Sequence, residues 1–544
     1  MRVSIHNVGA IGQINDVASY ELPPEVWTKT ENMVCKDGSI RTEGGTAGLY
    51  YNDELVVPQM KPRWALPVAG GLNYLLLYAG LDKIYATDGL NHADISRLVG
   101  GAYNAAIDTI WSGDMLGKIA IINNPEDAPQ MWTNTLRDDP SLALPVERLD
   151  NWPATYRAGV IRTHRNYIIA GDITKGAVNE KQLVLWSHVA DINDVPVTWD
   201  VTDPLYDAGE YPLLKTAGAV KDFVVLNNEI IVYKEDSTYL MRYIGGRFIW
   251  AFEPLFPAHG IINTRCAKAT KDGAQHVVVT RDDIVIHDGR EIRSLLTGRM
   301  RRWLMSRIDP EQLHNCFLVP NYDEDEFIFF YQPTTSTTNA ASAKVTINYL
   351  TGTVTPGFCE VTHHVTYDFV KETGDGSTID SQTIPIDSML GLFGQRGNLP
   401  LKRKLLGCSA VPLDLSEFYV TDVGYLYRDT FPLNSYCQRI GLAVMGQDRQ
   451  GNPKVAISPV KQWLGLWPKI TIDNGTYVKI RVGVQETQNA AVEWEPYMNF
   501  YPADMESVQF NIEGRLLAVE FKAEVGSIMN LRSYDVDVEV VGEY

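Results

Sequence analysis

The stretch LVLWSHVADINDVPVTW, from Leu183 to Trp199, combines residue types that sugar-binding and hydrolytic sites use. Trp186, His188 and Asp191 could supply an aromatic platform, a titratable base and a carboxylate. Both ends of the stretch nevertheless have the pattern of strands. The Asp, Asn and Pro residues between them are typical of turns, because short polar side chains bond nearby backbone N–H groups. We therefore interpret Trp186 and Trp199 as anchors of a loop between strands, with an aromatic ligand platform as the alternative.

Two other groups contain metal-ligating residue types. The run DEDE at Asp323–Glu326 could hold a hard cation, but it lies where a hairpin turn is expected. It also lacks the glycine and the downstream glutamate of a calcium loop. His363 and His364 are adjacent, so on a strand they point to opposite faces and do not readily share one ion. We predict a solvated turn for the carboxylates, structural or surface positions for the histidines, and no metal site.

Arginines cluster on the one clear helix candidate, SLLTGRMRRWLMSRID from Ser294. Apolar residues recur there at helical spacing, and Thr297 can cap the first turn. Trp303 and Leu304 predict a helix that lies on the protein with its basic side chains outward. The outward residues could contact phosphate, but a solvated face or a subunit contact is the favoured interpretation. They are Arg299, Arg301, Arg302 and Arg307.

The sequence contains none of the common catalytic or nucleotide-binding motifs, such as G-x-S-x-G, Walker A, G-x-G-x-x-G or H-E-x-x-H. A propeller glycosidase would need converging acids and usually carries S-x-D-x-G-x-T-W turns. The segment VTWDVTDP, residues 197–204, does not have that pattern. We therefore expect no catalytic residue and no cofactor.

Length and composition describe a large globular chain rich in sheet. With 544 residues it is too long for one compact core, so roughly three to four domains or one large repeat architecture are expected. Hydrophobic residues make up 45% and charged ones 21%, which is the balance of an ordinary globular protein. The 27 Tyr and 12 Trp favour pleated sheet, where flat side chains pack across strands.

The net charge of −19 argues against tight binding to a phosphate backbone, which needs concentrated Lys and Arg. It does not exclude a surface past which nucleic acid slides without adhering. No apolar run approaches the length of a membrane span, and the N-terminal segment lacks the apolar core of a secretory signal. Six cysteines without a C-x-x-C pair are expected to remain reduced thiols in a protein made in a cytoplasm.

One local design recurs along the chain: a hydrophobic strand, a tight polar turn and usually a second strand. Successive units lie about 40 to 60 residues apart, a period that suits four-stranded propeller blades. A chain of β-sandwich domains is the alternative. The units begin at Leu72, Lys118, Arg165, Leu226, Gln275 and Asp325.

Changes in composition divide the chain into four parts. Residues 1–60 form an N-terminal platform or closing segment, and 61–332 hold propeller blades. Residues 333–430 are rich in Ser, Thr and Gly in places and are expected to form an insertion with the remaining propeller strands. Residues 431–544 have longer alternating strands, which predict a separate antiparallel β domain of the platform or sandwich type with one buried face.

Several segments, taken in order, resemble the tail nozzle proteins of short-tailed bacteriophages, also called tail tubular or packaged-DNA stabilisation proteins. In the middle of the chain these are LVLWS, VYKEDSTYLMRYIGGRFIW, LFPAHGI and IVIHDG, and residues 21–45 are similar to the family's opening segment. GRLLAVEFKAE and LRSYDVDVEVVG are similar to its closing strands, and VGVQETQNAAVEWEPYMNF to the hairpin that precedes them. Residues 333–430 match least. The residues that carry the resemblance are Trp27, Asp37, Gly38, Trp186, Ser187, Tyr233, Lys234, Glu235, Tyr239, Gly245, Gly246, Asp288, Gly289, Gly514 and Arg515.

The resemblance implies an irregular β-propeller with platform strands, few short helices and no catalytic residues. It further implies a virion protein of the short tail, in which six copies form a ring below the portal-bound adaptor and contact tail fibre or tip proteins. The ring would conduct and retain double-stranded DNA without sequence-specific binding. We expect acidic residues to outnumber basic ones on its channel wall, because like charge keeps DNA from adhering. A host-surface glycan-binding module and, less favoured, a propeller glycosidase are the alternatives.

Overall fold

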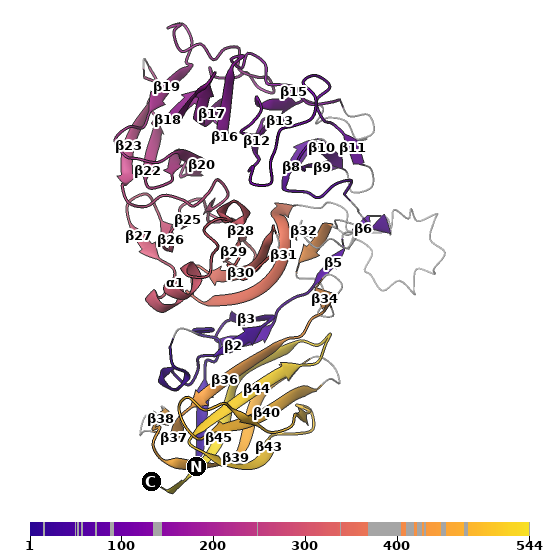
Figure 1. The fold of residues 1–544 in the computed structure, drawn as a ribbon, viewed down its shortest axis with the longest axis vertical. Helices are drawn as coiled ribbons and strands as arrows, with labels where there is room; N and C mark the ends of the chain where they lie inside the picture. Colours follow the sequence, from indigo (N-terminus) through magenta and orange to yellow (C-terminus); the bar gives the residue numbers. More distant parts are fainter. Residues whose placement is uncertain are drawn as a thin grey trace.

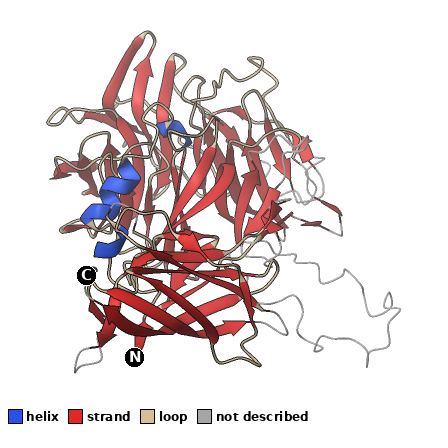
Figure 2. Cartoon of the chain, turned by 60° about the horizontal axis from the view of Figure 1, so that its bottom comes forward, coloured by secondary structure: helices blue, strands red, loops and turns tan. Residues whose placement is uncertain are grey.

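The fold was analysed in a computed structural model. It describes residues 1–14, 17–48, 50–51, 54–55, 58–70, 73–87, 92–133, 144–246, 248–337, 339–367, 404–409, 418–421, 427–428, 431–447, 453–472 and 477–542. Strands dominate these residues (Figure 2), and their helices are α1 (Gly298–Met305) and the short 3-10 turns η1 (Ser19–Glu21) and η3 (Leu313–Asn315). The predicted all-β class is confirmed.

Five sheets of four antiparallel strands follow one another along the chain and are arranged around a common axis (Figure 1). We call them blades 1 to 5. Blade 1 comprises β8 (Trp64–Gly70), β9 (Asn73–Ala79), β10 (Ile84–Thr87) and β11 (His92–Asp94), and blade 2 comprises β12 (Ser112–Leu116), β13 (Ile119–Asn123), β14 (Gln130–Trp132) and β15 (Glu147–Arg148). Blade 3 comprises β16 (Tyr156–His164), β17 (Tyr167–Lys175), β18 (Val178–Trp186) and β19 (Gly209–Pro212), and blade 4 comprises β20 (Val220–Leu226), β21 (Glu229–Lys234), β22 (Thr238–Tyr243) and β23 (Trp250–Phe256). Blade 5 comprises β24 (Ala267–Ala269), β25 (His276–Val279), β26 (Ile284–His287) and β27 (Ile292–Ser294).

A larger sheet, blade 6, completes the ring. Its strands, in order across the sheet, are β28 (Phe317–Asn321), β29 (Glu326–Tyr331), β30 (Ala341–Asn348), β31 (Val354–Tyr367), β32 (Lys404–Ser409), β33 (Phe418–Thr421) and β5 (Thr46–Gly48). The edge strand β5 comes from the N-terminal part of the chain and pairs with β33. The long strand β31 closes the ring against blade 1, because the Thr362 hydroxyl donates to the carbonyl of Pro62 just before β8. The predicted boundary at residue 332 falls inside this sheet, between β29 and β30.

The recurring hydrophobic units of the sequence correspond to the second strand of each blade, namely β9, β13, β17, β21, β25 and β29. These strands are apolar on both faces because each face packs on a neighbouring blade. Ile121 belongs to the cluster shared with blade 3, whereas its neighbour Ile122 belongs to the cluster shared with blade 1. Ile231 and Val232 divide in the same way between blades 5 and 3. Alternation along the strand thus produces continuous hydrophobic runs.

The two ends of the chain build a β-sandwich beneath the propeller (Figure 1). The predicted segments 1–60 and 431–544 both contribute to it. One sheet contains, in order, β3 (Met33–Lys36), β4 (Ser39–Thr42), β45 (Met529–Gly542), β39 (Val460–Ile472) and β43 (Val508–Gly514), and β1 (Arg2–His6) also pairs with β45. The other sheet contains, in order, β2 (Lys29–Glu31), β36 (Tyr436–Leu442), β44 (Leu516–Ala523), β40 (Val478–Gln485) and β41 (Glu493–Trp494), and β42 (Met498–Phe500) also pairs with β40. Small pairs are β6 (Tyr50–Tyr51) with β7 (Glu54–Leu55), β34 (Tyr427–Arg428) with β35 (Phe431–Pro432), and β37 (Val444–Gln447) with β38 (Pro453–Val455).

Trp27 joins the opening segment to the closing strands in the sandwich core. Its ring packs edge-on against Phe521, with centroids 6.1 Å apart, and lies 6.3 Å from the ring of Tyr534. Its indole N–H donates to the carbonyl of Val8 at 2.5 Å. Burial of this side chain and satisfaction of its polar atom both favour the assembled sandwich.

Truncation of Trp27 should therefore destabilise the sandwich. We expect Trp27→Ala to lower the free energy of unfolding by about 3–5 kcal/mol, because it leaves a cavity among buried rings. Trp27→Phe should cost less, since it keeps most of the apolar contact but leaves the Val8 carbonyl without its donor. Calorimetry combined with pulse proteolysis of the C-terminal strands would measure both. Equal losses for the two variants would contradict a packing role for the indole.

Candidate functional site

Trp186, at the end of β18, and Trp199, in the loop between β18 and β19, are both buried. Trp186 is 7% exposed, its indole N–H donates to the carbonyl of Asp207 at 2.8 Å, and its ring lies on Phe252. Trp199 is buried edge-on against Trp152, with ring centroids 4.6 Å apart. Neither ring presents a face on which a sugar could stack, so both are structural anchors.

The other polar residues of this stretch do not assemble into a catalytic group. The Nδ1 atom of His188 accepts the backbone N–H of Asp207 at 3.0 Å, and Asp191 is exposed in a turn closed by Asp194. Ser187, which follows Trp186, is fully buried; its hydroxyl accepts from the N–H of Ile168 and donates to the carbonyl of His188. The side chains of His188 and Ser187 thus bond backbone groups that would otherwise lack partners at the irregular end of the strand.

Lys234, Glu235 and Tyr239, which are among the residues that carry the resemblance, fix the crossing from blade 3 to blade 4. The fully buried Lys234 ammonium donates to the carbonyls of Leu213 and Thr216, at 2.9 and 2.5 Å. The Tyr239 hydroxyl is 3.0 Å from the hydroxyl oxygen of Thr216. Glu235 pairs with a lysine at 2.9 Å and accepts a backbone N–H of the same crossing. Burial lowers the pKa of Lys234, and the carbonyl partners solvate its charge in place of water.

Tyr233 connects blades 4 and 5 through two buried histidines. His276 donates from Nε2 to the Val225 carbonyl at 2.8 Å, so its Nδ1 accepts the Tyr233 hydroxyl at 2.8 Å. The Tyr233 oxygen then accepts from Nε2 of His287 at 2.6 Å, and Nδ1 of His287 accepts the N–H of Gly289. This assignment satisfies every ring nitrogen with both imidazoles neutral. Burial lowers the pKa of His276 to about 4 and that of His287 to about 3.

The remaining residues that carry the resemblance lie at turns and close packing points. Asp37 and Gly38 form the two-residue turn of the β3–β4 hairpin, with φ of 50° and 73°. Gly245, Gly246 and Gly289 also have positive φ, and the Asp288 carboxylate accepts two backbone N–H groups of its turn. A Cβ on Gly514 would lie 2.7 Å from the side chain of Val484, and the carbonyl of Arg515 accepts from a buried lysine.

The arginine-rich helix is α1, capped as expected by the Thr297 hydroxyl, which accepts the N–H of Met300. Met300 and Leu304 are its buried residues, and the four arginines are exposed. The prediction of an outward basic face is confirmed. The first three residues of the DEDE run form the turn between β28 and β29, where Glu324 pairs with Lys36 of the sandwich. The prediction of a solvated turn is wrong for Glu326, which begins β29 and is buried.

His363 and His364 are buried on β31 against one aromatic cluster. The His363 ring lies 5.8 Å from that of Phe317, and the His364 ring stacks 5.0 Å from that of Phe330, while these two phenylalanines stack on each other. Burial lowers the pKa of His364 to about 3 and that of His363 well below its usual value. Among the described residues, no group of three or more His, Cys, Asp or Glu is placed to hold a metal ion.

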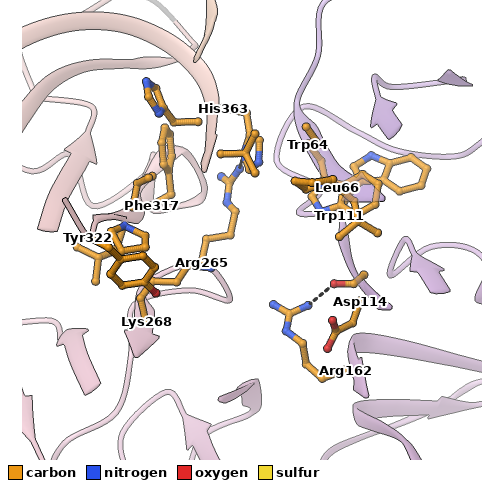
Figure 3. A pocket seen from close by; sticks show the side chains of 18 residues that line it. Trp64, Leu66, Trp111, Asp114, Arg162, Arg265, Lys268, Phe317, Tyr322 and His363 are labelled. Atoms are coloured by element: carbon orange, nitrogen blue, oxygen red, sulfur yellow. Dashed lines mark hydrogen bonds between the residues drawn. The ribbon is translucent and has the colours of Figure 1, made fainter. Parts of the chain in front are cut away.

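The candidate site that the structure adds is a cavity of about 440 Å³ on the propeller axis. We call it the axial cavity. Figure 3 shows Trp64, Leu66 and Trp111 on one side of it and Arg265, Lys268 and Tyr322 on the other. A smaller cavity of about 170 Å³ shares Asp114, Arg162 and Lys268 with it. Inner strands of blades 1, 2, 3, 5 and 6 thus each contribute to the wall.

Positive charge predominates in the axial cavity. Arg162 is neutralised by Asp222 of blade 4, with a nitrogen–oxygen distance of 2.9 Å. Asp114 accepts the backbone N–H groups of Met115 and Thr163. Neither Arg265 nor Lys268 has a carboxylate within ion-pair distance among the described residues. Burial lowers the pKa of Arg265 to about 10 and also lowers the pKa of Lys268, which Arg162 lowers further.

The sequence contains no local motif for this cavity, because each wall residue comes from a different blade. What the sequence does show is the position of these polar residues relative to the repeated units. Each lies on, or just before, the strand that precedes a recurring hydrophobic unit. Alignment of the units would have placed Asp114, Arg162 and Lys268 on innermost strands. Their proximity follows only from ring closure.

Comparisons with known proteins do not identify a family. No family model and no curated protein matches the sequence. Among solved structures, one similar chain is the Pan2 WD40 domain of Neurospora crassa, with 12% identity over 58% of this chain and 84% of that chain and a TM-score of 0.29. Another is the AfRom2 CNH domain, with 9% identity over 69% of this chain and 98% of that chain and a TM-score of 0.36. A third is a putative 6-phosphogluconolactonase of Bacteroides fragilis, with 10% identity over 72% of this chain and 92% of that chain and a TM-score of 0.33. These scores are too low to support an inference about this chain.

Removal of the Tyr233 hydroxyl should destabilise the propeller. Tyr233→Phe leaves an acceptor on His276 and a donor on His287 without partners, and a buried unsatisfied group costs about 1–3 kcal/mol. The expected result is a lower calorimetric transition of the propeller with the sandwich transition unchanged. Tyr243→Phe, at an exposed tyrosine of the same blade, is the control. Equal stability of Tyr233→Phe and wild type would contradict this network.

Acid should weaken the same region through these histidines. Their folded pKa values lie below the unfolded value of about 6.5, so the unfolded chain takes up protons first as the pH falls. The stabilisation is complete above that value and is lost as the pH falls from about 6.5 to about 4 for His276 and about 3 for His287, at up to about 1.4 kcal/mol per pH unit and histidine. Thermal scans across this range would show a shallower pH slope when His276, His287 and Tyr233 are replaced by Leu, Leu and Phe. An unchanged slope would contradict the prediction.

Proposed function

We propose that this chain is a structural protein of a short bacteriophage tail, a tail nozzle subunit that acts in a ring below the portal-bound adaptor. The observation that carries the proposal is the sandwich. The segments similar to the family's opening and closing parts lie at opposite ends of the chain, yet they build one core around Trp27, Phe521 and Tyr534. The opening and closing segments are therefore joined by contact as well as by order.

The roles of the central residues that carry the resemblance also support a structural function. Tyr233, Lys234 and Tyr239 hold neighbouring blades together through buried hydrogen bonds, and Trp186 anchors a loop. Such contacts resist deformation, which a conduit for pressurised DNA requires. The glycan-binding alternative has no comparable support, because the tryptophan that it needs as a platform is buried.

Loops of blades 3 and 4 offer contact surfaces for the proposed ring. Ile192 and Leu205 in the β18–β19 loop are each 84% exposed, Leu214 is 73% exposed, and Phe248 is 71% exposed. Exposed apolar side chains of this size favour contact with another protein surface. In the proposed assembly they would meet a neighbouring subunit, the adaptor, or a fibre or tip protein. Double-stranded DNA would pass through the ring without sequence-specific contacts. Among the described residues, no helix is long and apolar enough to span a membrane.

Gold labelling of virus particles from the source of this chain tests the proposal directly. An antibody raised against the purified chain should label the far end of a short tail in negative stain. Pre-immune serum is the negative control, and an antibody against a known tail component is the positive control. Particles that label with the tail control and not with this antibody would refute the virion role.

Assembly gives an independent test. We expect the purified chain to form closed rings on adaptor-bearing portal particles, visible by electron microscopy. Leu205→Glu with Phe248→Glu should weaken ring formation at least about tenfold if these side chains lie in the contact, because each places a charge in a desolvated interface. Val178→Glu, at a 62% exposed residue on β18, is the matched control. Binding of isolated chains to host polysaccharide in place of adaptor would favour the glycan-binding alternative.

A further inference from the structure

The axial cavity has an electrostatic imbalance that the described residues do not correct. Its nearby cations are Arg63, Arg162, Arg265 and Lys268, whereas its carboxylates are Asp114 and Asp222. The ion pair found among these groups joins Arg162 to Asp222. Positive charges thus exceed negative ones by two, and among the described residues no carboxylate lies within ion-pair distance of Arg265 or Lys268, although Asp222 attracts Lys268 from farther away. Such an excess of charge in a partly buried site is costly.

Arg265 is held by several neutral contacts and keeps its positive charge. Its Nη1 atom lies 3.5 Å from the Arg63 carbonyl oxygen and 3.4 Å from Nδ1 of His363, and its Nη2 donates to the His314 carbonyl. The guanidinium also lies over the Phe317 ring, 5.3 Å from its centroid. The Nε–H is buried and has no hydrogen-bond partner. Neutral acceptors position this cation without cancelling its charge.

Lys268, which is partly exposed, differs from the buried lysines Lys234 and Lys461. The ammonium groups of Lys234 and Lys461 each donate to two or more backbone carbonyls. For the Lys268 ammonium, by contrast, the described residues provide no hydrogen bond or ion pair. Its side chain lines both the axial cavity and the smaller cavity beside Arg162. Because this lysine lines a cavity and its ammonium bonds no described residue, the ammonium is available to a ligand.

We propose that the axial cavity binds a small phosphate-type dianion, either inorganic phosphate or the phosphate group of a small organic molecule. Lys268 is the principal contact, and Arg265 and Arg162 contribute positive potential from either side. A dianion balances the excess of two positive charges, and its oxygens accept the hydrogen bonds that the ammonium can donate. This site is separate from the ring contacts of the proposed function and does not depend on them.

The wall opposite the cations is the part of the cavity that an organic group attached to the phosphate would meet. Trp64 and Trp111 stack there with centroids 6.4 Å apart, and Leu66 lies beside them (Figure 3). A volume of about 440 Å³ lies within the range of small-molecule sites. Trp64 and Trp111 are 5% and 2% exposed, so they offer little free surface, and an organic group attached to the phosphate would meet this wall mainly beside Leu66.

Titration calorimetry on the full chain tests the site, with inorganic phosphate and adenosine monophosphate as probes at constant ionic strength. We expect saturable binding of one anion per chain. Lys268→Gln should raise the dissociation constant at least about tenfold, because it removes a charge-assisted contact. Lys215→Gln, which removes the same charge from an exposed position, is the matched control and should bind as wild type does.

The melting temperature supplies a second test. The change in melting temperature on substitution of Lys268, with and without phosphate, distinguishes a lysine that binds a ligand from one that only stabilises the fold. In chloride, Lys268→Met should melt close to the wild-type temperature, because it removes the repulsion from Arg162 and Arg265 together with the attraction to Asp222. In phosphate, wild type should gain stability and the variant should not. Absence of binding by both probes, or equal binding by wild type and Lys268→Gln, would overturn the proposal. Tighter binding of inorganic phosphate than of the nucleotide would assign the ligand as the free ion.

Discussion

The architecture depends on the pairing of the first 48 residues with strands far along the chain. β1 and β4 pair with β45, β2 pairs with β36, and β5 pairs with β33 in blade 6. The first three pairings create the sandwich, and the last helps to close the propeller. Without them, the edges of three sheets would be open to solvent, and open edges are sites of aggregation. A short N-terminal segment therefore connects two bodies that otherwise have separate cores.

Local features of the fold could be predicted from the sequence because their causes are local. The Asp37–Gly38 turn follows from the low cost of positive φ in these residue types, and the α1 cap follows from the Thr297 hydroxyl. The hydrophobic units predicted strands correctly because burial on both faces leaves a continuous apolar run. Their spacing is uneven because some connections, such as the β18–β19 loop, are long. A regular period was therefore absent although the blades are regular.

Pairings between residues hundreds of positions apart could not be predicted in the same way. Nothing in the residues of β5 indicates that its partner is β33, since either strand would fit many edges. The axial cavity has the same difficulty, because Asp114, Arg162 and Lys268 come from three blades. By contrast, the interpretation of Trp186 and Trp199 as structural anchors needed only the turn residues between them, and their burial agrees with it.

The pairing of β1 with β45 has a consequence for the order of folding. The N-terminal amine bonds Asp537 and the carbonyl of Val538, so the first residues have their native partners only after the last strand emerges from the ribosome. During translation β1 and the free edge of the β3–β4 hairpin wait for β45, and β2 waits for β36, while successive blades can already pack. Synthesis speed and chaperone protection of this waiting segment should thus govern the yield of native chain more than the stability of the finished fold does.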